Sequence, residues 1–308
     1  SSAPVRSKPV LPGNVRILGA ASLLNDVASE MIFPLLPGFL LTLAAGNKFY
    51  LGIIEGLADS VASLLKLWSG AWSDRAGRRK GFVVLGYSLA ALIRPWVGVI
   101  SATWQLALIR VGDRIGKGIR TSPRDALIAE SCAPELRGRA FGFHRAMDHL
   151  GAAIGPILAT AFLWFWPDQI RTLFLLALIP GLAVTALVLF GLQEPPKDPV
   201  VASTESSGLG PDSTPRESEA RLFSFRGLGQ FDSNFRRFLL ALLIFSLGNS
   251  SDAFLLLRAE ELGVPRMMLP VLWCLFHLMK SASNVWCGNG VDRFGPMWFI
   301  LTGWGLYA

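Results

Sequence analysis

The chain alternates long apolar segments with short charged ones. Residues 82–100 and 173–192 carry at most one charged residue each, and each has the roughly 20 residues that a helix needs to cross a bilayer. Applied along the whole chain, this pattern predicts nine membrane helices, the ninth cut off by the end of the sequence. Their approximate bounds are 15–45, 50–73, 81–101, 104–131, 138–166, 170–192, 237–262, 265–288 and 296–308.

The segment between the sixth and seventh predicted helices breaks this pattern. Residues 194–235 are rich in Pro, Ser and Gly, mixed in charge and without periodicity, which is typical of a linker. We therefore predict three parts. They are an N-terminal six-helix transmembrane half at 1–193, a cytoplasmic linker at 194–235, and a partial C-terminal half, with three helices, at 236–308.

Composition argues against a soluble protein. The 308 residues are 52% hydrophobic and 17% charged, with a mean hydropathy of +0.45, whereas soluble domains carry about 25% charged residues. The net charge of +7 comes from basic residues clustered between the apolar segments, so we expect no nucleic-acid partner. Basic loops mark the cytoplasmic side. This predicts a multi-pass protein of the inner (plasma) membrane, with the lipid bilayer as its partner and its N-terminus in the cytoplasm.

The residue types also give no sign of catalysis. Cys132, Cys274 and Cys287 lack the spacing of a disulfide framework or a zinc site, and no nucleophile–base arrangement is evident. Residues 110–125 contain glycines, a lysine and hydroxyls, but the spacing required of a phosphate-binding loop is missing. We expect no enzyme, no cofactor and no metal.

The sequence contains two copies of one pattern. The form G-x-x-x-D-R-x-G occurs at 70–77 and again at 288–295, 218 residues later. Asn25 and Asn249, in similar contexts in the first and seventh predicted helices, lie 224 residues apart. The nearly equal offsets indicate a six-helix unit followed by a second copy, an organisation found in secondary transporters.

Four motifs then resemble those of the major facilitator superfamily (MFS). They are "GAWSDRAGRRK" at 70–80, "RVGDRIGKG" at 110–118, "APELRGRAFG" at 133–142 and "GAAIGPILA" at 151–159. The resemblance implies an all-α polytopic membrane protein with an MFS-type six-helix N-terminal half and an incomplete C-terminal half. Members of this family normally have twelve helices, so we expect a chain truncated after the start of the ninth.

The resemblance also implies roles for two groups of residues. In relatives, the first motif lies between helices two and three and helps to latch the two halves together during conformational switching. We expect this conformational latch to consist of Gly70, Asp74, Arg75, Gly77, Arg78, Arg79 and Glu130, with Asp74 at a neighbouring helix end. The last motif is typical of antiporters, and its Gly151, Gly155 and Pro156 are expected to serve helix packing.

Charged residues inside the predicted spans are the candidates for substrate and proton handling, because charge is costly in a bilayer. In helix 104–131 the charged residues from Arg110 to Asp125 fall within an arc of about 140°. Arg114 lies near mid-membrane, either lining a cavity or pairing with a buried acid. Arg120 and Arg124 are expected to reach the interface. The candidate pathway residues are Asn25, Asp26, Glu30, Asp59, Arg110, Arg114, Asp148, Asn249 and Asp252.

Asp26 and Glu30 are the first candidates for proton coupling. They are spaced i,i+4 on an otherwise apolar helix, where burial favours the protonated form of a carboxylate and a nearby arginine favours the ionised form. A structural pairing with the arginines of helix 104–131 or with Lys66 stays open. For His144, a local pair with Asp148 is expected.

Taken together, the sequence predicts transport of a small solute by alternating access, with proton-coupled efflux (antiport) as the favoured form. The basic arc favours an anionic or zwitterionic solute, although a proton site would explain these charges too. A symporter or uniporter is the alternative within the transport class. A truncated, non-transporting membrane protein, such as a fragment, partner or sensor, is the alternative outside it.

Overall fold

The computed structural model describes residues 11–45, 47–194, 232–248, 251–280 and 296–307. All regular secondary structure in these residues is helical. The chain divides into two compact units, unit 1 with residues 1–195 and 251–294, and unit 2 with residues 196–250 and 295–308. The boundaries expected at 193 and 236 stay a prediction.

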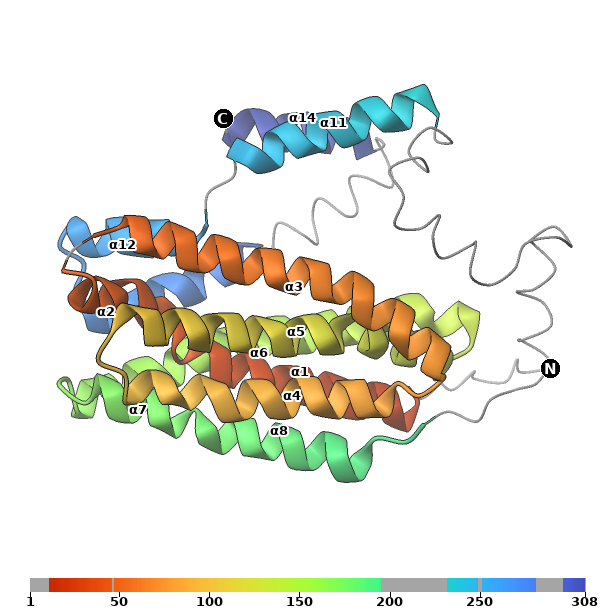
Figure 1. Ribbon diagram of the computed structural model, residues 1–308, viewed down its shortest axis with the longest axis horizontal. Helices are drawn as coiled ribbons and strands as arrows, with labels where there is room; N and C mark the ends of the chain where they lie inside the picture. Colours follow the sequence, from red (N-terminus) through yellow and green to blue (C-terminus); the bar gives the residue numbers. More distant parts are fainter. Residues whose placement is uncertain (1–10, 46, 195–231, 249–250, 281–295, 308) are drawn as a thin grey trace, which may run out of the picture. The chain divides into compact units, whose positions relative to one another are not determined.

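Unit 1 contains a bundle of long helices that lie side by side (Figure 1). The six helices predicted in residues 15–192 are all present, three of them interrupted. Their elements are α1 (Gly13–Glu30), η1 (Phe33–Leu35), α2 (Leu36–Leu43), α3 (Phe49–Ala76), α4 (Lys80–Ile93), η2 (Arg94–Gly98), α5 (Thr103–Glu130), η3 (Pro134–Leu136), α6 (Arg137–Phe165), α7 (Ile170–Leu176) and α8 (Leu178–Gly191). Unit 1 also holds α12 (Ala253–Glu261), η6 (Arg266–Met268) and a helix from residue 269 to 280, here called helix 269–280.

The first predicted helix is interrupted near its middle. Regular α-helix ends at Glu30, the 3₁₀ turn η1 follows, and α2 begins at Leu36. Pro34 lies in η1 and Pro37 in the first turn of α2, and proline disrupts helical hydrogen bonding because it has no N–H. The two prolines account for the interruption, and Glu30 lies directly before it.

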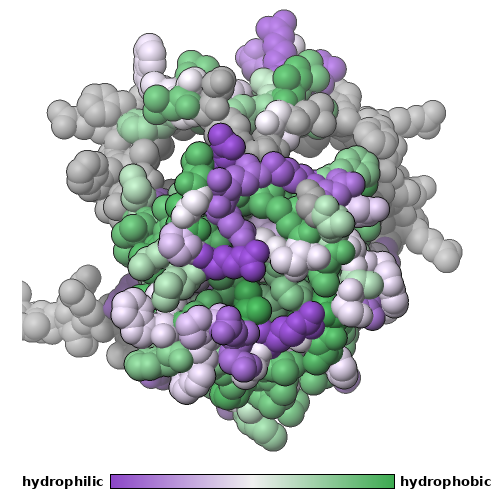
Figure 2. Space-filling view, turned by 90° about the vertical axis from the view of Figure 1, so that its left-hand side faces the viewer, coloured by the Kyte–Doolittle hydropathy of each residue, from purple (hydrophilic) through white to green (hydrophobic). Residues whose placement is uncertain are grey.

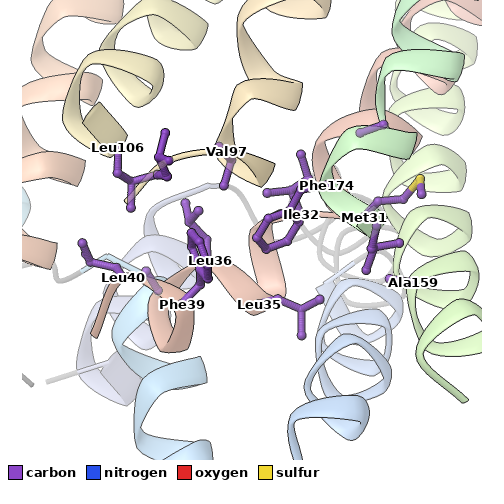
Figure 3. Close-up of a cluster of buried hydrophobic side chains, with 14 of the residues drawn as sticks. Met31, Ile32, Leu35, Leu36, Phe39, Leu40, Val97, Leu106, Ala159 and Phe174 are labelled. Carbon is purple, nitrogen blue, oxygen red and sulfur yellow. The ribbon is translucent and has the colours of Figure 1, made fainter. Parts of the chain in front are cut away.

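A cluster of buried apolar side chains surrounds this break (Figure 3). It joins η1 and α2 to residues from η2, α5, α6 and α7, and its rings include an edge-to-face contact between Phe39 and Phe174 with centroids 5.3 Å apart. Because closely packed interiors resist small shifts, the cluster holds the break in one position. Its members include Met31, Ile32, Leu35, Leu36, Phe39, Leu40, Val97, Leu106, Ala159 and Phe174.

Four helical segments in the described residues are long and apolar enough to cross a membrane: Gly13–Leu43, Lys80–Gly98, Arg137–Phe165 and Ile170–Gly191. The helices α3 and α5 have 28 residues each, so they have the length but carry many charges. The outer surface of α3 is nevertheless apolar, as expected for contact with lipid. Its exposed side chains include Leu57, Leu64, Leu67, Trp68 and Trp72.

The second half of the sequence departs from the expected helices. In place of one helix over 237–262, the structure has α11 (Ser233–Gly248) in unit 2 and α12 in unit 1, with Ser251 and Asp252 outside both helices. Unit 2 also contains α14 (Pro296–Tyr307), and the Phe245 ring of α11 stacks on Trp304 of α14 at 4.8 Å. Residues 281–295, with the second copy of the motif, lie outside the described residues.

Glycines of α6 allow α1 to approach closely. A Cβ atom at Gly151 would overlap the carbonyl oxygen of Leu23, and one at Gly155 would lie 2.8 Å from that of Val27. Pro156 lies inside α6 beside them. Gly142 in the same helix has no atom within 4 Å of its Cβ position. The α1–α6 contact therefore depends on Gly151 and Gly155 but not on Gly142.

This difference predicts opposite effects for the same substitution. Gly151→Ala should destabilise the protein by about 1–3 kcal/mol through overpacking. Gly142→Ala should be neutral or slightly stabilising, because alanine favours helix more than glycine does. Thermal unfolding in detergent, followed by tryptophan fluorescence, measures both. Equal melting temperatures for the two variants would contradict the close packing of α1 on α6.

Candidate functional site

The helix α5 places a row of charged side chains inside unit 1. Arg110, Asp113 and Arg120 are 8%, 5% and 5% exposed. The opposite faces of α5 carry glycines, and a Cβ at Gly116 would lie 2.7 Å from the carbonyl oxygen of Gly86 in α4. Small residues thus bring the neighbouring helices close to α5, and the buried charges need partners from these neighbours.

Arg94 of η2 is the partner of Asp113. Its Nε and Nη2 donate to Asp113 Oδ1 at 3.1 and 2.7 Å, and its Nη1 donates to the backbone oxygen of Asn25 at 3.2 Å. The Asn25 side-chain oxygen accepts a further bond from Nη2 at 3.4 Å. Both charged side chains are buried. This group joins α1, η2 and α5. The role of Arg94 could not be predicted from the sequence, because a single arginine in an apolar segment gives no pattern.

Arg110 and Arg114 pair with acids of α3. Arg110 donates to both carboxylate oxygens of Glu55, from Nε at 2.8 Å and from Nη2 at 2.6 Å, a bidentate geometry that gives strong and specific pairing. Arg114 Nε lies 3.1 Å from Asp59 Oδ1, and its Nη2 lies 4.0 Å from Glu55. We refer to Glu55, Asp59 and Asp113 as the arginine-paired acids.

Arg120 does not reach the interface as expected. Its side chain is buried, and the guanidinium lies 4.5 Å from the centre of the Tyr87 ring. A cation above an aromatic face is stabilised electrostatically, but Arg120 Nε and Nη1 are buried without a hydrogen-bond partner among the described residues. Arg124, nearer the end of α5, pairs with Asp125 at 2.9 Å, and Lys117 is exposed.

The acids of α1, Asp26 and Glu30, have different surroundings. Asp26 accepts a hydrogen bond from Asn25 Nδ2 at 2.9 Å, and Glu30 accepts one from Trp273 Nε1 at 2.6 Å. Both side chains are half-buried. Among the described residues, neither acid has an ion pair within 4 Å, so the expected alternative of a structural pair with α5 or Lys66 is not found there.

Asp148 of α6 lies next to α1. It accepts a hydrogen bond from the Ser22 hydroxyl, and His144 Nδ1 and Arg145 Nη1 lie 3.6 and 3.7 Å from its Oδ2. The expected contact between His144 and Asp148 is therefore present. Asp252 accepts a hydrogen bond from Lys280 at 2.7 Å. Asn249 lies outside the described residues.

The expected latch residues gather where α3 ends and α4 begins. Gly77 ends α3 in the left-handed region at φ 57°, a position that favours glycine. Arg79 Nη2 lies 2.9 Å from Asp74 Oδ1 and 2.8 Å from Glu130 Oε1, so it links α3 to the end of α5. Gly70 faces Ser122 of α5, and Arg75 and Arg78 are exposed.

Another acid occupies the start of α4. Glu194 accepts hydrogen bonds from the backbone N–H groups of Arg79 and Lys80 at 2.6 and 3.0 Å, the place where a helix favours negative charge. Asp74, which was expected at a neighbouring helix end, pairs with Arg79 in the described part of the chain. The role of these residues in a latch stays a prediction.

The Arg94–Asp113 pair gives a direct test of the buried network. Asp113→Asn should destabilise the protein by about 3–5 kcal/mol, because it leaves Arg94 buried without its counter-charge. Arg145→Gln, which removes a side chain that is 71% exposed, should cost no more than about 1 kcal/mol. Chemical or thermal unfolding in detergent compares the two. Similar losses for both variants would contradict the burial of the pair.

Comparison with known proteins identifies relatives over most of the chain. Residues 18–308 match the family model described as Major Facilitator Superfamily. An uncharacterized MFS-type transporter of Methanocaldococcus jannaschii is 32% identical, over 97% of this chain and 71% of that protein. An uncharacterized protein of Mycobacterium tuberculosis is 30% identical over 57% of this chain and 43% of its own length.

A multidrug resistance protein MdtH of Photorhabdus laumondii is 28% identical over 50% of this chain and 40% of that protein. The chain thus spans less than half the length of the mycobacterial and MdtH relatives. Among solved structures, a bacterial homolog of the human lysosomal transporter Spinster, inward-facing and unoccupied, matches with a TM-score of 0.64 at 20% identity. That match covers 94% of this chain and 64% of the other. At this identity it shows a shared fold.

Proposed function

Because the chain belongs to the Major Facilitator Superfamily, a family of membrane transporters, we propose that it exchanges a small solute for protons by alternating access. The family and the structural likeness give an all-helical, multi-pass membrane fold and a transporter rather than an enzyme.

The observation that carries the proposal is a difference between the acids of α1 and those of α3 and α5. The arginine-paired acids each lie within 4 Å of an arginine. Asp26 and Glu30 have hydrogen-bond donors instead, and no ion pair within 4 Å among the described residues. An adjacent cation favours the ionised form of a carboxylate, whereas burial without one favours the protonated form. Asp26 and Glu30 are therefore the acids best suited to bind and release a proton.

Arg114 and Arg110 act in this scheme through position and charge. Both are committed to α3 by ion pairs, so direct capture of the solute by Arg114 is the less favoured of its two expected roles.

Two features favour export. A relative of 28% identity bears the name multidrug resistance protein, and residues 151–159 have the motif typical of antiporters. In an exchanger, a proton and the solute compete for the same acids, so each leaves when the other binds. Asp148 accepts a hydrogen bond from Ser22, one turn before Asp26, and so extends the proposed pathway toward α6. In the second half, we assign Asp252 and Asn249 to the same pathway.

Proton-coupled exchange can be measured in proteoliposomes that contain a pH-sensitive dye. After a pH gradient is imposed, addition of a substrate should release protons across the membrane in wild-type protein. Cationic, zwitterionic, anionic and neutral solutes of similar size are compared, with ethidium as the cationic member. Asp26→Asn and Glu30→Gln should reduce this release at least about tenfold, because neither amide can carry a proton.

Asp168→Asn, at an exposed acid between α6 and α7, is the matched control and should retain wild-type exchange. Solute flux that is independent of the pH gradient would refute proton coupling and indicate a uniporter. Proton and solute movement in the same direction would indicate a symporter. Wild-type exchange in both α1 variants would refute the assignment of Asp26 and Glu30.

A further inference from the structure

One hydrogen bond joins residues 243 positions apart in the sequence. Trp273 of helix 269–280 donates its indole N–H to Glu30 Oε2 at 2.6 Å. Trp273 is 5% exposed, and Glu30 is the last residue of α1 before the break. The bond therefore connects the proton-binding candidate of the first half directly to a helix of the second.

Aromatic neighbours hold the indole ring in place. Its centroid lies 5.1 Å from that of Phe33 in η1, 5.4 Å from that of Phe276 and 4.8 Å from that of His277. Such ring pairs have preferred geometries that resist reorientation. Since the indole N–H can only donate, Trp273 serves Glu30 solely as a hydrogen-bond donor.

The strength of this bond depends on the charge of Glu30. A hydrogen bond to an ionised acceptor is roughly twice as strong as one between neutral groups. When Glu30 binds a proton, or when a cationic group of a solute neutralises it, the donor loses its charged acceptor. The contact between α1 and helix 269–280 weakens as a result.

The bond belongs to a longer interface in which α1, η1 and α2 pack against α12, η6 and helix 269–280. We call this interface the α1–α2 seam. Farther along the seam, the Glu260 carboxylate lies against Gly38, and Arg266 donates to Glu260 at 2.7 Å. Lys48 and Glu261 pair at its end, where both side chains are partly exposed. Hydrogen bonds from Lys48 and Arg258 lower the pKa of Glu261.

Farther along the seam, the basic partners of the ion pairs, Lys48 and Arg266, are exposed. Hydrophilic side chains gather on the end of the helices that carries α2 and α12 (Figure 2). A cavity of about 200 Å³ opens there between Leu35, Phe39, Arg171, Glu260 and Arg266. Exposed ion pairs are weak because water and salt screen them. In the Trp273–Glu30 bond the donor is uncharged, so the strength of this contact follows the charge state of Glu30.

We propose that Trp273 is a positioning residue that couples the ionisation of Glu30 to closure of the α1–α2 seam. Ionised Glu30 holds the seam closed, and a proton or a cationic solute group releases it. A carrier that has bound neither a proton nor a solute stays closed at this end. Exchange requires this, because an empty carrier that opened freely would let the solute cross without a proton moving the other way. The coupling rests on the proposed role of Glu30 as a proton carrier.

Other charged and titratable groups face Glu30 from α1, η2, α5 and helix 269–280. Arg94 and Arg114 are committed to ion pairs with Asp113 and Asp59, and Lys117 acts on Glu30 from the same helix as Arg114. Asp26 lies one turn earlier in α1, and His277 packs on the Trp273 ring. Substituting Trp273 therefore tests the hydrogen bond without removing any of these charges.

Indole N–H signals report the bond directly in the full-length chain. With ¹⁵N-labelled tryptophan, the signal absent from Trp273→Phe identifies Trp273, and Trp104→Phe, which changes an exposed tryptophan, is the control. The Trp273 signal should shift with pH in a single step in wild type and in Trp104→Phe. In Glu30→Gln, which keeps an acceptor oxygen but cannot ionise, the step should disappear. A step that persists in Glu30→Gln, or its absence in wild type, would overturn the coupling.

Transport then tests its consequence. In the proteoliposome assay, Trp273→Phe should move the midpoint of the pH profile up by about one unit, because the ionised form of Glu30 loses a charge-assisted bond. Trp104→Phe should leave the midpoint unchanged. A lower rate with an unchanged midpoint in Trp273→Phe would mean a purely structural role and would overturn the coupling. If no solute exchanges with protons but the Trp273 signal titrates, the proposed function fails and the coupling stands.

Discussion

Charge inside a membrane helix bundle must be neutralised by its neighbours, and this requirement organises unit 1. The helix α5 carries its charges inward, and each arginine–acid pair fixes one neighbour: Arg94–Asp113 fixes η2, and Arg110–Glu55 fixes α3. Glycines on the other faces of α5 allow those neighbours to approach closely enough for the pairs to form. Packing and electrostatics thus depend on each other, and α3, α4 and α5 form one tightly connected group.

The helix α1 is connected to this group differently. It contributes the backbone oxygen and side chain of Asn25 to Arg94, but its own acids pair with hydrogen-bond donors. It packs on α6 through glycines and, through Trp273, on a helix of the second half. The helix α1 thus carries titratable acids and lies between the group α3–α4–α5 and a helix of the second half. Proton binding can therefore act on α1. This arrangement supports both the proposed exchange and the proposed role of Trp273.

The sequence predicted the family, the all-helical membrane fold and the first six helices, because hydrophobic periodicity and four local motifs carry that information. Arg94 and Trp273 were missed because their importance comes from partners distant in sequence, Asp113 and Glu30, which no local pattern shows. The expected position of Arg120 at the interface was wrong, since its side chain is buried beside the Tyr87 ring. The expected helix over 237–262 was also wrong, because α11 and α12 are separate.

The central claim is that Asp26 and Glu30 exchange protons while the buried, arginine-held Asp113 does not. Infrared difference spectra of the full-length protein between low and high pH detect the carbonyl stretch of protonated carboxylic acids. We predict a band that Asp26→Asn and Glu30→Gln each diminish and that Asp113→Asn leaves in place. Loss of the band in Asp113→Asn, with no change in the two α1 variants, would contradict the account.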